Sequence, residues 1–464
     1  MANTTALGVV DAAGADRGGS APEGATRYHA LGPHHLDSIA ERYRLSPEQR
    51  DTIAVHSAVL PFRTNSYVLD ELIDWASVPD DPMFQLVFPQ PGMLSRVHER
   101  QARDLLAHAG RAKRAAGINA IRDALNPHPA GQQALNVPEL EQERLAGVQH
   151  KYRQTVLYFP AQGQTCHAYC TYCFRWAQFV GDADLRFAAK TPGSLVSYLG
   201  EHPEVTDVLV TGGDPMIMTT QRLRNHIEPL LDVATVQTIR FGTKSLAYWP
   251  QRFVSDADAD DLLRLFEQII AAGKTVAVMA HFSHDRELST DTVRAALARI
   301  RGTGAVIYCQ APIMRGINDD AEVWRRMWTT QLALGAVPYY MFMARDTGPR
   351  EYFEVPIVRA VEVFHGAYQS LPGLARTVRG PSMSATPGKI VIDGVLGSGS
   401  ARVFGARFLQ ARNPALVGRP FQFQFSATAV WADELVPVAG TPRDILRALE
   451  MLRMEAEADG TGAA

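Results

Sequence analysis

From residue 151 onward the chain alternates between short runs of β-branched and aromatic residues and longer stretches of helical pattern. Strands this apolar, each followed by one helix, are typical of a parallel sheet that is covered on both faces. Six such units favour an α/β barrel or partial barrel, in which the chemistry gathers at the C-terminal ends of the strands. The predicted strands occupy residues 155–159, 205–210, 236–241, 275–280, 305–310 and 337–342.

The regions on either side of this repeating part have a different texture. The first residues are rich in Ala, Gly, Ser and Thr and contain almost nothing large and apolar, which predicts a disordered tail. A helical periodicity follows, and the last part of the chain mixes strands and turns before a final helix. The predicted organisation is a tail over 1–27, a helical N-terminal region over 28–150, the β/α barrel over 151–375 and a mixed C-terminal region over 376–464.

Composition excludes several classes of protein. The chain carries 46 Lys and Arg against 49 Asp and Glu, so its net charge of −3 argues against a nucleic-acid partner. No apolar run approaches the roughly 18 residues that cross a membrane, and the N-terminus lacks the basic start of a secretory signal. Four cysteines in 464 residues exclude a disulfide scaffold. We therefore expect a cytoplasmic protein without a membrane partner.

Three of the four cysteines lie within eight residues, directly after the first predicted strand, at Cys166, Cys170 and Cys173. Three soft thiolates on one loop suit an iron–sulfur cluster or a zinc ion. A tetrahedral structural zinc needs a fourth ligand, for which His167 lies too close in sequence and Cys309 lies inside a predicted strand. The pattern therefore favours a three-cysteine site with one open iron position, with structural zinc as the alternative.

This CxxxCxxC spacing after the first strand of a β/α barrel resembles the radical S-adenosylmethionine (SAM) superfamily. The resemblance implies that the three thiolates hold a 4Fe-4S cluster whose fourth iron binds the amino and carboxylate groups of SAM. Reduction would then cleave SAM and release a 5′-deoxyadenosyl radical. Thr211-Gly212-Gly213-Asp214-Pro215, after the second strand, is similar to the superfamily's glycine-rich motif, which implies that Gly212, Gly213 and Asp214 contact SAM.

A wider set of segments resembles the lysine 2,3-aminomutase family, in the same order and over roughly residues 85–390. The resemblance implies pyridoxal phosphate (PLP) as a further cofactor, whose π-system holds the unpaired electron while an amino group migrates from C2 to C3. The matching segments are HKYRQTVLYF (150–159), the cysteine motif with CFR (166–175), VLVTGGDP (208–215), residues 241–252, HFSH (281–284), Gln310 with RGIND (315–319) and PYY (338–340).

The family resemblance assigns roles around PLP. Lys389 ends a glycine-containing segment and matches the lysine that carries PLP as a Schiff base. Lys151 matches a basic residue near the PLP phosphate, whereas a second basic position is Thr155 here, which weakens the phosphate contact because a hydroxyl offers only a neutral hydrogen bond. His281 and Gln310 match residues that line the cofactor pocket. The tyrosine pair that follows Pro338 is assigned to packing.

The same resemblance bears on the substrate. Arg175 falls where the family binds the substrate α-carboxylate, a task that suits a guanidinium fork. Lysine-specific members hold the distal ammonium with two aspartates, and Arg345 and Arg379 fall on those positions, although Asp346 is only one residue away. Two arginines would repel a lysine side chain and attract a carboxylate. We therefore expect an anionic small-molecule amino acid, glutamate or aspartate, either free or carrier-bound.

Two other functions are compatible with the sequence. One is a radical SAM enzyme of the same family with a changed reaction, such as another rearrangement, an epimerisation or an elimination, with or without PLP. The other is a non-catalytic protein that binds an iron–sulfur cluster or zinc on a barrel scaffold. No cysteine follows Cys309, so we expect no C-terminal zinc site of the kind found in the family. The expected partners are a one-electron reductant of flavodoxin or ferredoxin type and a second copy of the chain.

Overall fold

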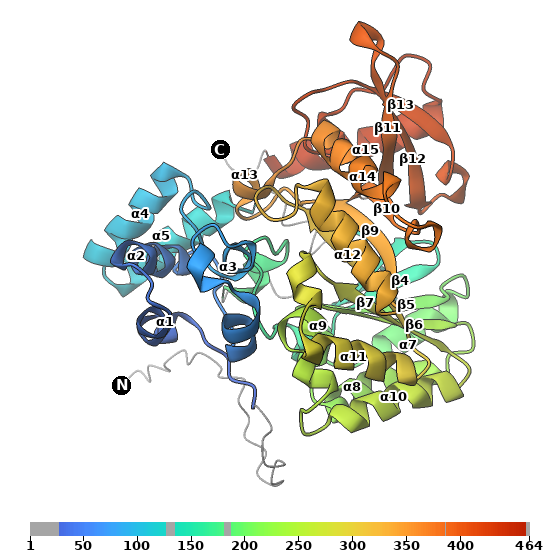
Figure 1. Ribbon diagram of the computed structural model, residues 1–464. Helices are drawn as coiled ribbons and strands as arrows, with labels where there is room; N and C mark the ends of the chain where they lie inside the picture. The colour runs from blue at the N-terminus through green and yellow to red at the C-terminus, as the bar shows by residue number, and fades with distance from the viewer. Residues whose placement is uncertain (1–26, 127–134, 181–186, 386, 461–464) are drawn as a thin grey trace, which may run out of the picture.

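The computed structural model describes residues 27–126, 135–180, 187–385 and 387–460, so the predicted tail lies outside the described residues apart from Arg27. Its central feature is one eleven-stranded mixed sheet in the order β13-β12-β11-β10-β9-β8-β7-β6-β5-β4-β3 (Figure 1). The strands are β3 (Val148–Tyr152), β4 (Thr155–Tyr158), β5 (Asp207–Val210), β6 (Thr238–Thr243), β7 (Thr275–His281), β8 (Val306–Ile313), β9 (Val337–Met343), β10 (Arg379–Ser384), β11 (Gly388–Leu396), β12 (Val403–Ala411) and β13 (Pro420–Gln424).

The six predicted strands are confirmed as β4 to β9, which are parallel neighbours in chain order. β10 continues the parallel part beside β9. Antiparallel strands flank both ends, because β3 pairs with β4 as a hairpin and β11 to β13 form a meander after β10. The α/β class is therefore confirmed, with a mixed sheet that extends beyond the predicted six units on both sides.

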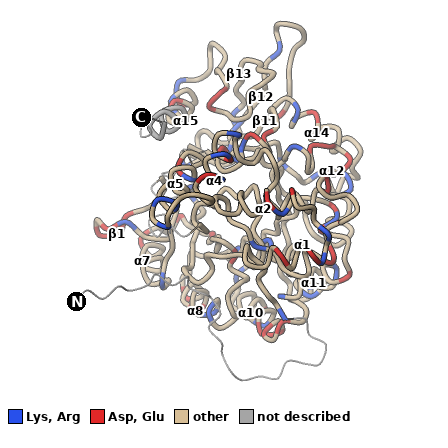
Figure 2. Tube along the Cα trace, turned by 90° about the vertical axis from the view of Figure 1, so that its left-hand side faces the viewer, with Lys and Arg blue, Asp and Glu red and all other residues tan. Residues whose placement is uncertain are grey.

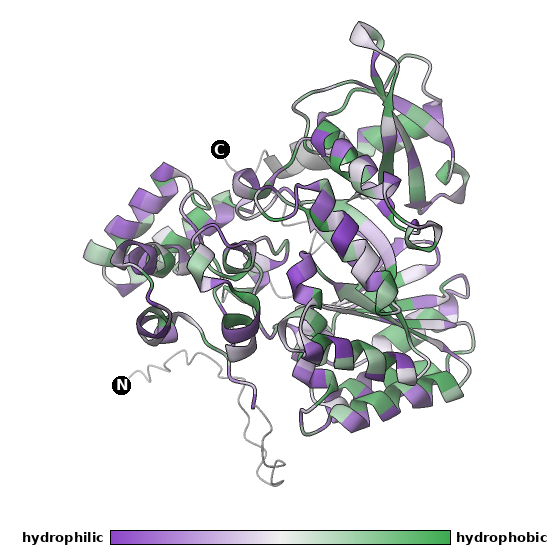
Figure 3. Cartoon of the chain, viewed as in Figure 1, coloured by the Kyte–Doolittle hydropathy of each residue, from purple (hydrophilic) through white to green (hydrophobic). Residues whose placement is uncertain are grey.

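Helices cover the outer face of the parallel strands, and Figure 3 shows apolar and polar residues on each of α8, α10 and α11. In α10, for example, Leu262, Phe266 and Ile269 are buried, whereas the charged residues Arg264 and Glu267 are exposed. From this region to the C-terminus the helices are α7 (Gly193–Glu201), α8 (Thr220–Leu231), α9 (Ser245–Tyr248), α10 (Ala259–Ala271), α11 (Asp291–Gly302), α12 (Ala321–Ala333), α13 (Arg350–Phe353), α14 (Ile357–Gln369) and α15 (Arg443–Gly460).

The sheet curves until strands from its two ends face each other. The Tyr152 hydroxyl of β3 lies 3.0 Å from the Ser384 hydroxyl of β10. Arg412, just after β12, donates a hydrogen bond of 3.0 Å to the carbonyl of His150 in β3. Side chains on the inner face of the parallel strands are therefore enclosed by the sheet itself.

The N-terminal region packs beside the sheet as a separate group of helices (Figure 1). Its predicted helical character is found over residues 36–124, whereas a short hairpin of β1 (Glu139–Leu140) and β2 (Glu143–Arg144) follows, and β3 already begins before residue 151. The helices are α1 (Leu36–Tyr43), α2 (Pro47–Ser57), α3 (Pro82–Val87), α4 (Arg96–His108) and α5 (Arg111–Ala124).

The charged residues do not gather by sign. Figure 2 shows Lys and Arg interspersed with Asp and Glu along the chain, in keeping with the small net charge. In the part of the chain that the structure describes, every helix is too short or too polar to span a bilayer.

Candidate active site

The three-cysteine motif lies in the loop between β4 and α7, and the N-terminal region holds this loop in place. The Arg63 guanidinium donates to the Thr165 hydroxyl at 2.6 Å and to the Cys166 carbonyl at 3.3 Å. Buried Asn65 donates to the carbonyl of His167 at 3.1 Å, and the Tyr28 hydroxyl donates to the same carbonyl at 2.9 Å. The sequence did not predict these hydrogen bonds from the N-terminal region, because no local pattern identifies a residue that contacts a loop about 100 positions away.

The three thiols are close enough to affect one another. Burial raises the pKa of Cys166 and Cys170 above the usual range and that of Cys173 to about 12. A neighbouring thiolate of the trio raises it further at Cys166 and Cys173. Within the described ranges, Cys, His, Asp and Glu side chains form no group of three around a single point that could hold one ion. An iron–sulfur cluster binds each thiolate to a different iron, so its ligands are spread more widely, and their deprotonation accompanies metal binding.

The glycine-rich motif lies directly against the cysteine loop. The Asp214 amide donates to the carbonyls of Gly163 at 3.0 Å and of Thr165 at 2.8 Å. The buried Asp214 carboxylate accepts hydrogen bonds from its own chain, including the amide of Lys244 at 2.8 Å and the hydroxyl of Thr243 at 2.8 Å. Asp214 therefore ties the motif to the cysteine loop through its amide and to the end of β6 through its carboxylate.

Gly213 permits this close approach. A Cβ atom at position 213 would lie 2.5 Å from both the backbone nitrogen and the backbone oxygen of Thr165, directly before Cys166. We expect Gly213→Ala to cost about 1–3 kcal/mol in the free energy of unfolding and to displace the cysteine loop. Iron content after anaerobic reconstitution should fall well below that of wild type. Gly200→Ala is the matched control, because no atom lies within 4 Å of its added Cβ, and equal iron content in both variants would contradict the prediction.

A polar network at the ends of β6 and β7 includes the predicted cofactor residue His281. Burial lowers the pKa of His281 to about 3, and the nearby Lys244 ammonium acts in the same direction, so the imidazole is neutral. Its Nδ1 lies 3.3 Å from the Tyr172 hydroxyl, which lies in the cysteine loop. Lys244 forms a 2.7 Å ion pair with Glu287, which is fully buried. The network connects the cysteine loop to the strand ends.

Lys389 lies at the start of β11 and is buried, with 7% of its surface exposed. Its Nζ lies 3.8 Å from the ring centre of Tyr340 and 4.9 Å from that of Phe342, but it makes no hydrogen bond or ion pair to any residue that the structure describes. Burial lowers the pKa of Lys389 well below the usual range, and the charges of Lys151, Arg240 and Arg379 add to the effect. Burial and these charges favour the neutral, nucleophilic form of the amine, which is the form that a carbonyl-binding lysine requires.

Two of these cations, Arg240 and Arg379, contact residues on the inner face of the sheet near Lys389. Arg240 of β6 donates to the Asp207 carboxylate at 2.7 Å and to the Thr155 hydroxyl at 3.2 Å. Arg379 donates to the Tyr340 hydroxyl at 3.3 Å. Tyr339 and Tyr340 were assigned to packing, but Tyr340 has a further role, because its ring forms the surface against which Lys389 lies. Arg240 was missed, because one arginine in a strand carries no local signal.

Arg175 is buried and only partly satisfied. It is 6% exposed, its guanidinium lies 4.1 Å from the ring centre of Phe159, and its Nη1 has no hydrogen-bond partner among the residues described. A buried guanidinium nitrogen without a hydrogen-bond partner is costly, so this position suits an anionic ligand. Arg345 lies close enough to lower the pKa of Arg175, an effect that is smaller than that of burial.

The two arginines predicted to bind the substrate side chain lie in different surroundings. Arg345 lies on the Arg175 side, where it donates to the Ser384 carbonyl at 2.6 Å and lies 5.5 Å from the ring centre of Trp431. Arg379 is exposed and lies on Tyr340, beside Lys389. Of the pair, Arg345 is therefore the one that the fold brings next to the predicted α-carboxylate site.

The remaining predicted residue, Gln310, connects the two halves of this region. In the sheet register it pairs with His281 of β7 on one side and with Tyr340 of β9 on the other. Gln310 therefore lies in one row between the polar network of the cysteine loop and the wall of the lysine site.

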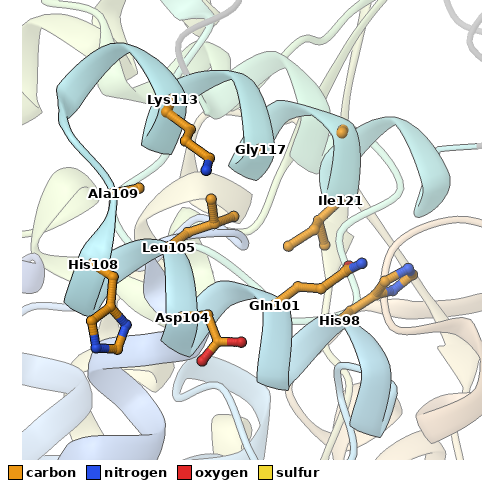
Figure 4. Close-up of a pocket in the computed structure, with 10 residues that line it drawn as sticks. His98, Gln101, Asp104, Leu105, His108, Ala109, Lys113, Gly117 and Ile121 are labelled. Carbon is orange, nitrogen blue, oxygen red and sulfur yellow. The ribbon is translucent and has the colours of Figure 1, made fainter.

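The structure also has a groove of about 650 Å³ between α4 and α5, outside this region (Figure 4). His98, Asp104, His108 and Lys113 are among its lining residues. None of the predicted site residues lines it, so the candidate active site remains the sheet interior.

No family model matches the chain. The chain is 31% identical over 388 residues to a protein of Aquifex aeolicus (strain VF5) named "Putative L-lysine 2,3-aminomutase", a match that covers 83% of this chain and 91% of the relative. The chain belongs to the lysine 2,3-aminomutase family. The family consists of radical SAM enzymes of the isomerase class.

Two shorter matches to family members differ in the substrate that their names state. An "L-lysine 2,3-aminomutase" of Fusobacterium nucleatum subsp. nucleatum is 26% identical over 237 residues, which are 51% of this chain and 53% of the relative. A "Glutamate 2,3-aminomutase" of Clostridioides difficile (strain 630) is 26% identical over 198 residues, which are 43% of this chain and 44% of the relative. Membership of the lysine 2,3-aminomutase family therefore leaves the substrate to be argued from the site.

Proposed function

We propose that this chain is a PLP-dependent amino-acid 2,3-aminomutase that uses SAM and a 4Fe-4S cluster on a radical SAM partial barrel. Its substrate is an anionic amino acid, with glutamate and aspartate as the first candidates. The reductant is a one-electron carrier of flavodoxin or ferredoxin type, the enzyme works in the cytoplasm, and it forms a homodimer.

The observation that carries this proposal is the environment of Lys389. A buried amine with a lowered pKa lies against Tyr340, and three cations act on it, which suits a ligand that carries both a carbonyl carbon and a phosphate. This favours the PLP-dependent reaction over a PLP-free reaction of the same family. When bound, SAM on its cluster supplies the initiating radical and PLP supplies a π-system that delocalises the unpaired electron.

The remaining residues bind and orient the substrate in this proposal. Arg175 takes the α-carboxylate with its unpartnered Nη1, and Arg345 takes the side-chain carboxylate. Neutral His281 and Gln310 lie between the cysteine loop and Lys389, where they hold the reacting groups in position without adding charge. The substrate is fixed at both ends, as migration between adjacent carbons requires.

The test is an anaerobic assay of reconstituted enzyme with SAM, PLP and a reductant. Lysine, arginine, glutamate, aspartate and alanine are offered, and β-amino products are detected by mass spectrometry after derivatisation. A β-amino acid from glutamate or aspartate but not from lysine is expected. Product from lysine would retain the reaction but overturn the anionic substrate, and SAM cleavage without any β-amino product would point to a changed reaction.

Replacing Arg345 tests the side-chain contact directly. We expect Arg345→Gln to raise KM for the preferred acidic substrate by about 10–100-fold, since one charge-assisted hydrogen bond contributes roughly 1.5–3 kcal/mol. The kcat at saturation should change much less. Arg359→Gln, an exposed arginine beside Glu362 on α14, is the control. Unaltered KM in the Arg345 variant would remove the basis for an anionic substrate.

A further inference from the structure

Arg240 lies in an unusual position for a structural arginine. It projects from the middle of β6 with only 15% of its side chain exposed, and its guanidinium spans β5 and β4 through Asp207 and Thr155. By the resemblance to the family, Thr155 stands at the position of a second basic residue near the PLP phosphate. The guanidinium of Arg240 therefore lies 3.2 Å from the hydroxyl that occupies the place of the lost charge.

We propose that Arg240 takes over the role of the missing cation and binds the phosphate of PLP together with Lys151 and the Thr155 hydroxyl. The inference rests on the proposed function, because it assumes that Lys389 binds PLP. It goes beyond that function by assigning a phosphate contact to a strand that the sequence comparison with the family did not single out.

Charge and hydrogen-bond geometry support this assignment. Arg240 and Lys151 are among the cations whose fields reach Lys389. The Thr155 hydroxyl accepts a hydrogen bond from Arg240, which leaves its proton available for a phosphate oxygen. The guanidinium presents donors in a planar fork and uses Nε on Asp207 and Nη2 on Thr155, so Nη1 is free of any partner among the described residues.

A purely structural ion pair is the competing explanation, and the chain contains a matched example of one. Arg407 on β12 pairs with Asp393 on the neighbouring strand β11 at 3.0 Å, and both side chains are exposed. Arg240 and Asp207 differ in being enclosed by the curved sheet near Lys389. Loss of Arg407 should therefore leave cofactor binding unchanged, whereas loss of Arg240 should not.

The experiment compares PLP with pyridoxal, which has the same aldehyde but no phosphate. Apo protein is titrated with each, and the absorbance of the lysine-linked cofactor gives Kd without any turnover. We expect Arg240→Gln to raise Kd for PLP by about 10–100-fold and to leave Kd for pyridoxal unchanged. Adding Thr155→Arg to that variant should recover at least part of the PLP affinity, and Arg407→Gln should match wild type.

The outcomes separate the two proposals. Wild type that binds neither ligand through Lys389 would overturn the PLP-dependent function and this inference with it. Wild type that binds PLP, with Arg240→Gln binding it equally well, would overturn only this inference. Should Arg240→Gln fail to fold, Asp207→Asn releases the guanidinium from its partner and should tighten PLP binding relative to pyridoxal. Equal weakening of both ligands in that variant would identify the pair as structural.

Discussion

Replacing Lys389 by methionine is expected to abolish turnover and, at the same time, to stabilise the protein without cofactor. The proposed reaction needs a covalent link between this amine and PLP, so we expect kcat to fall by at least about 10³-fold, the order seen when a covalent catalytic group is removed. Absorbance of the linked cofactor should be absent, and borohydride treatment should label Lys389 in wild type only. Methionine keeps a long flexible side chain against the Tyr340 ring.

The stability gain follows from the lowered pKa of Lys389. Between that lowered pKa and the unfolded value near 10.4, the unfolded chain binds a proton that the native amine does not. The free energy of unfolding of the wild type therefore rises with pH in this window and falls as the pH is lowered. Each unit of depression corresponds to about 1.4 kcal/mol.

Thermal melts of the apo proteins measure this effect. The difference in Tm between Lys389→Met and wild type should favour the variant and grow as the pH is lowered from about 10. Saturating PLP should stabilise the wild type but not the variant. A variant that melts below wild type across the whole pH range would show that Lys389 is a structural lysine and would count against its role with PLP.

Replacing Arg175 by glutamine is expected to have the second largest effect, through substrate binding. Removing one partner of a buried, hydrogen-bonded charge pair costs about 2–5 kcal/mol, so kcat/KM should fall by roughly 30-fold to several thousand-fold. Folding should survive, because the Nη1 that is lost has no partner within the described part of the chain. The loss should appear mainly in KM if the contact is equal in the ground and transition states.

The substrate methyl ester makes this prediction specific. Wild type should discriminate strongly against the ester, whereas Arg175→Gln should bind acid and ester with similar affinity. Arg252→Gln is the matched control, since Arg252 is equally buried but pairs with Asp258 at 2.7 Å, so its loss should lower stability and leave KM unchanged. Undiminished discrimination in the Arg175 variant would show that this arginine does not bind the α-carboxylate.

Local patterns in the sequence were sufficient for the central fold. A strand that is covered on both faces appears in the sequence as a short run of apolar residues. This is why β4 to β9 were predicted within a few positions. The cysteine motif and the glycine pair before Asp214 could also be found from the sequence, because each is a short motif with its own spacing, whereas Lys389 was singled out only by the resemblance to the family. The pairing partners of these six strands then follow their order in the chain.

Contacts between distant segments were decided only by the tertiary structure. Arg63 and Asn65 reach the cysteine loop from the N-terminal region, and Arg240 on β6 reaches Thr155 on β4 across the intervening strand β5. The sequence placed Arg345 and Arg379 as one substrate-binding pair, and the folded chain puts Arg345 near Arg175 and Arg379 on Tyr340. A motif indicates only what its own residues can do. The charge around Lys389 comes from Lys151, Arg240 and Arg379, which are brought near it only when their separate strands assemble into the sheet. The sequence therefore determined which groups this enzyme possesses, and the folded sheet decided which of them meet.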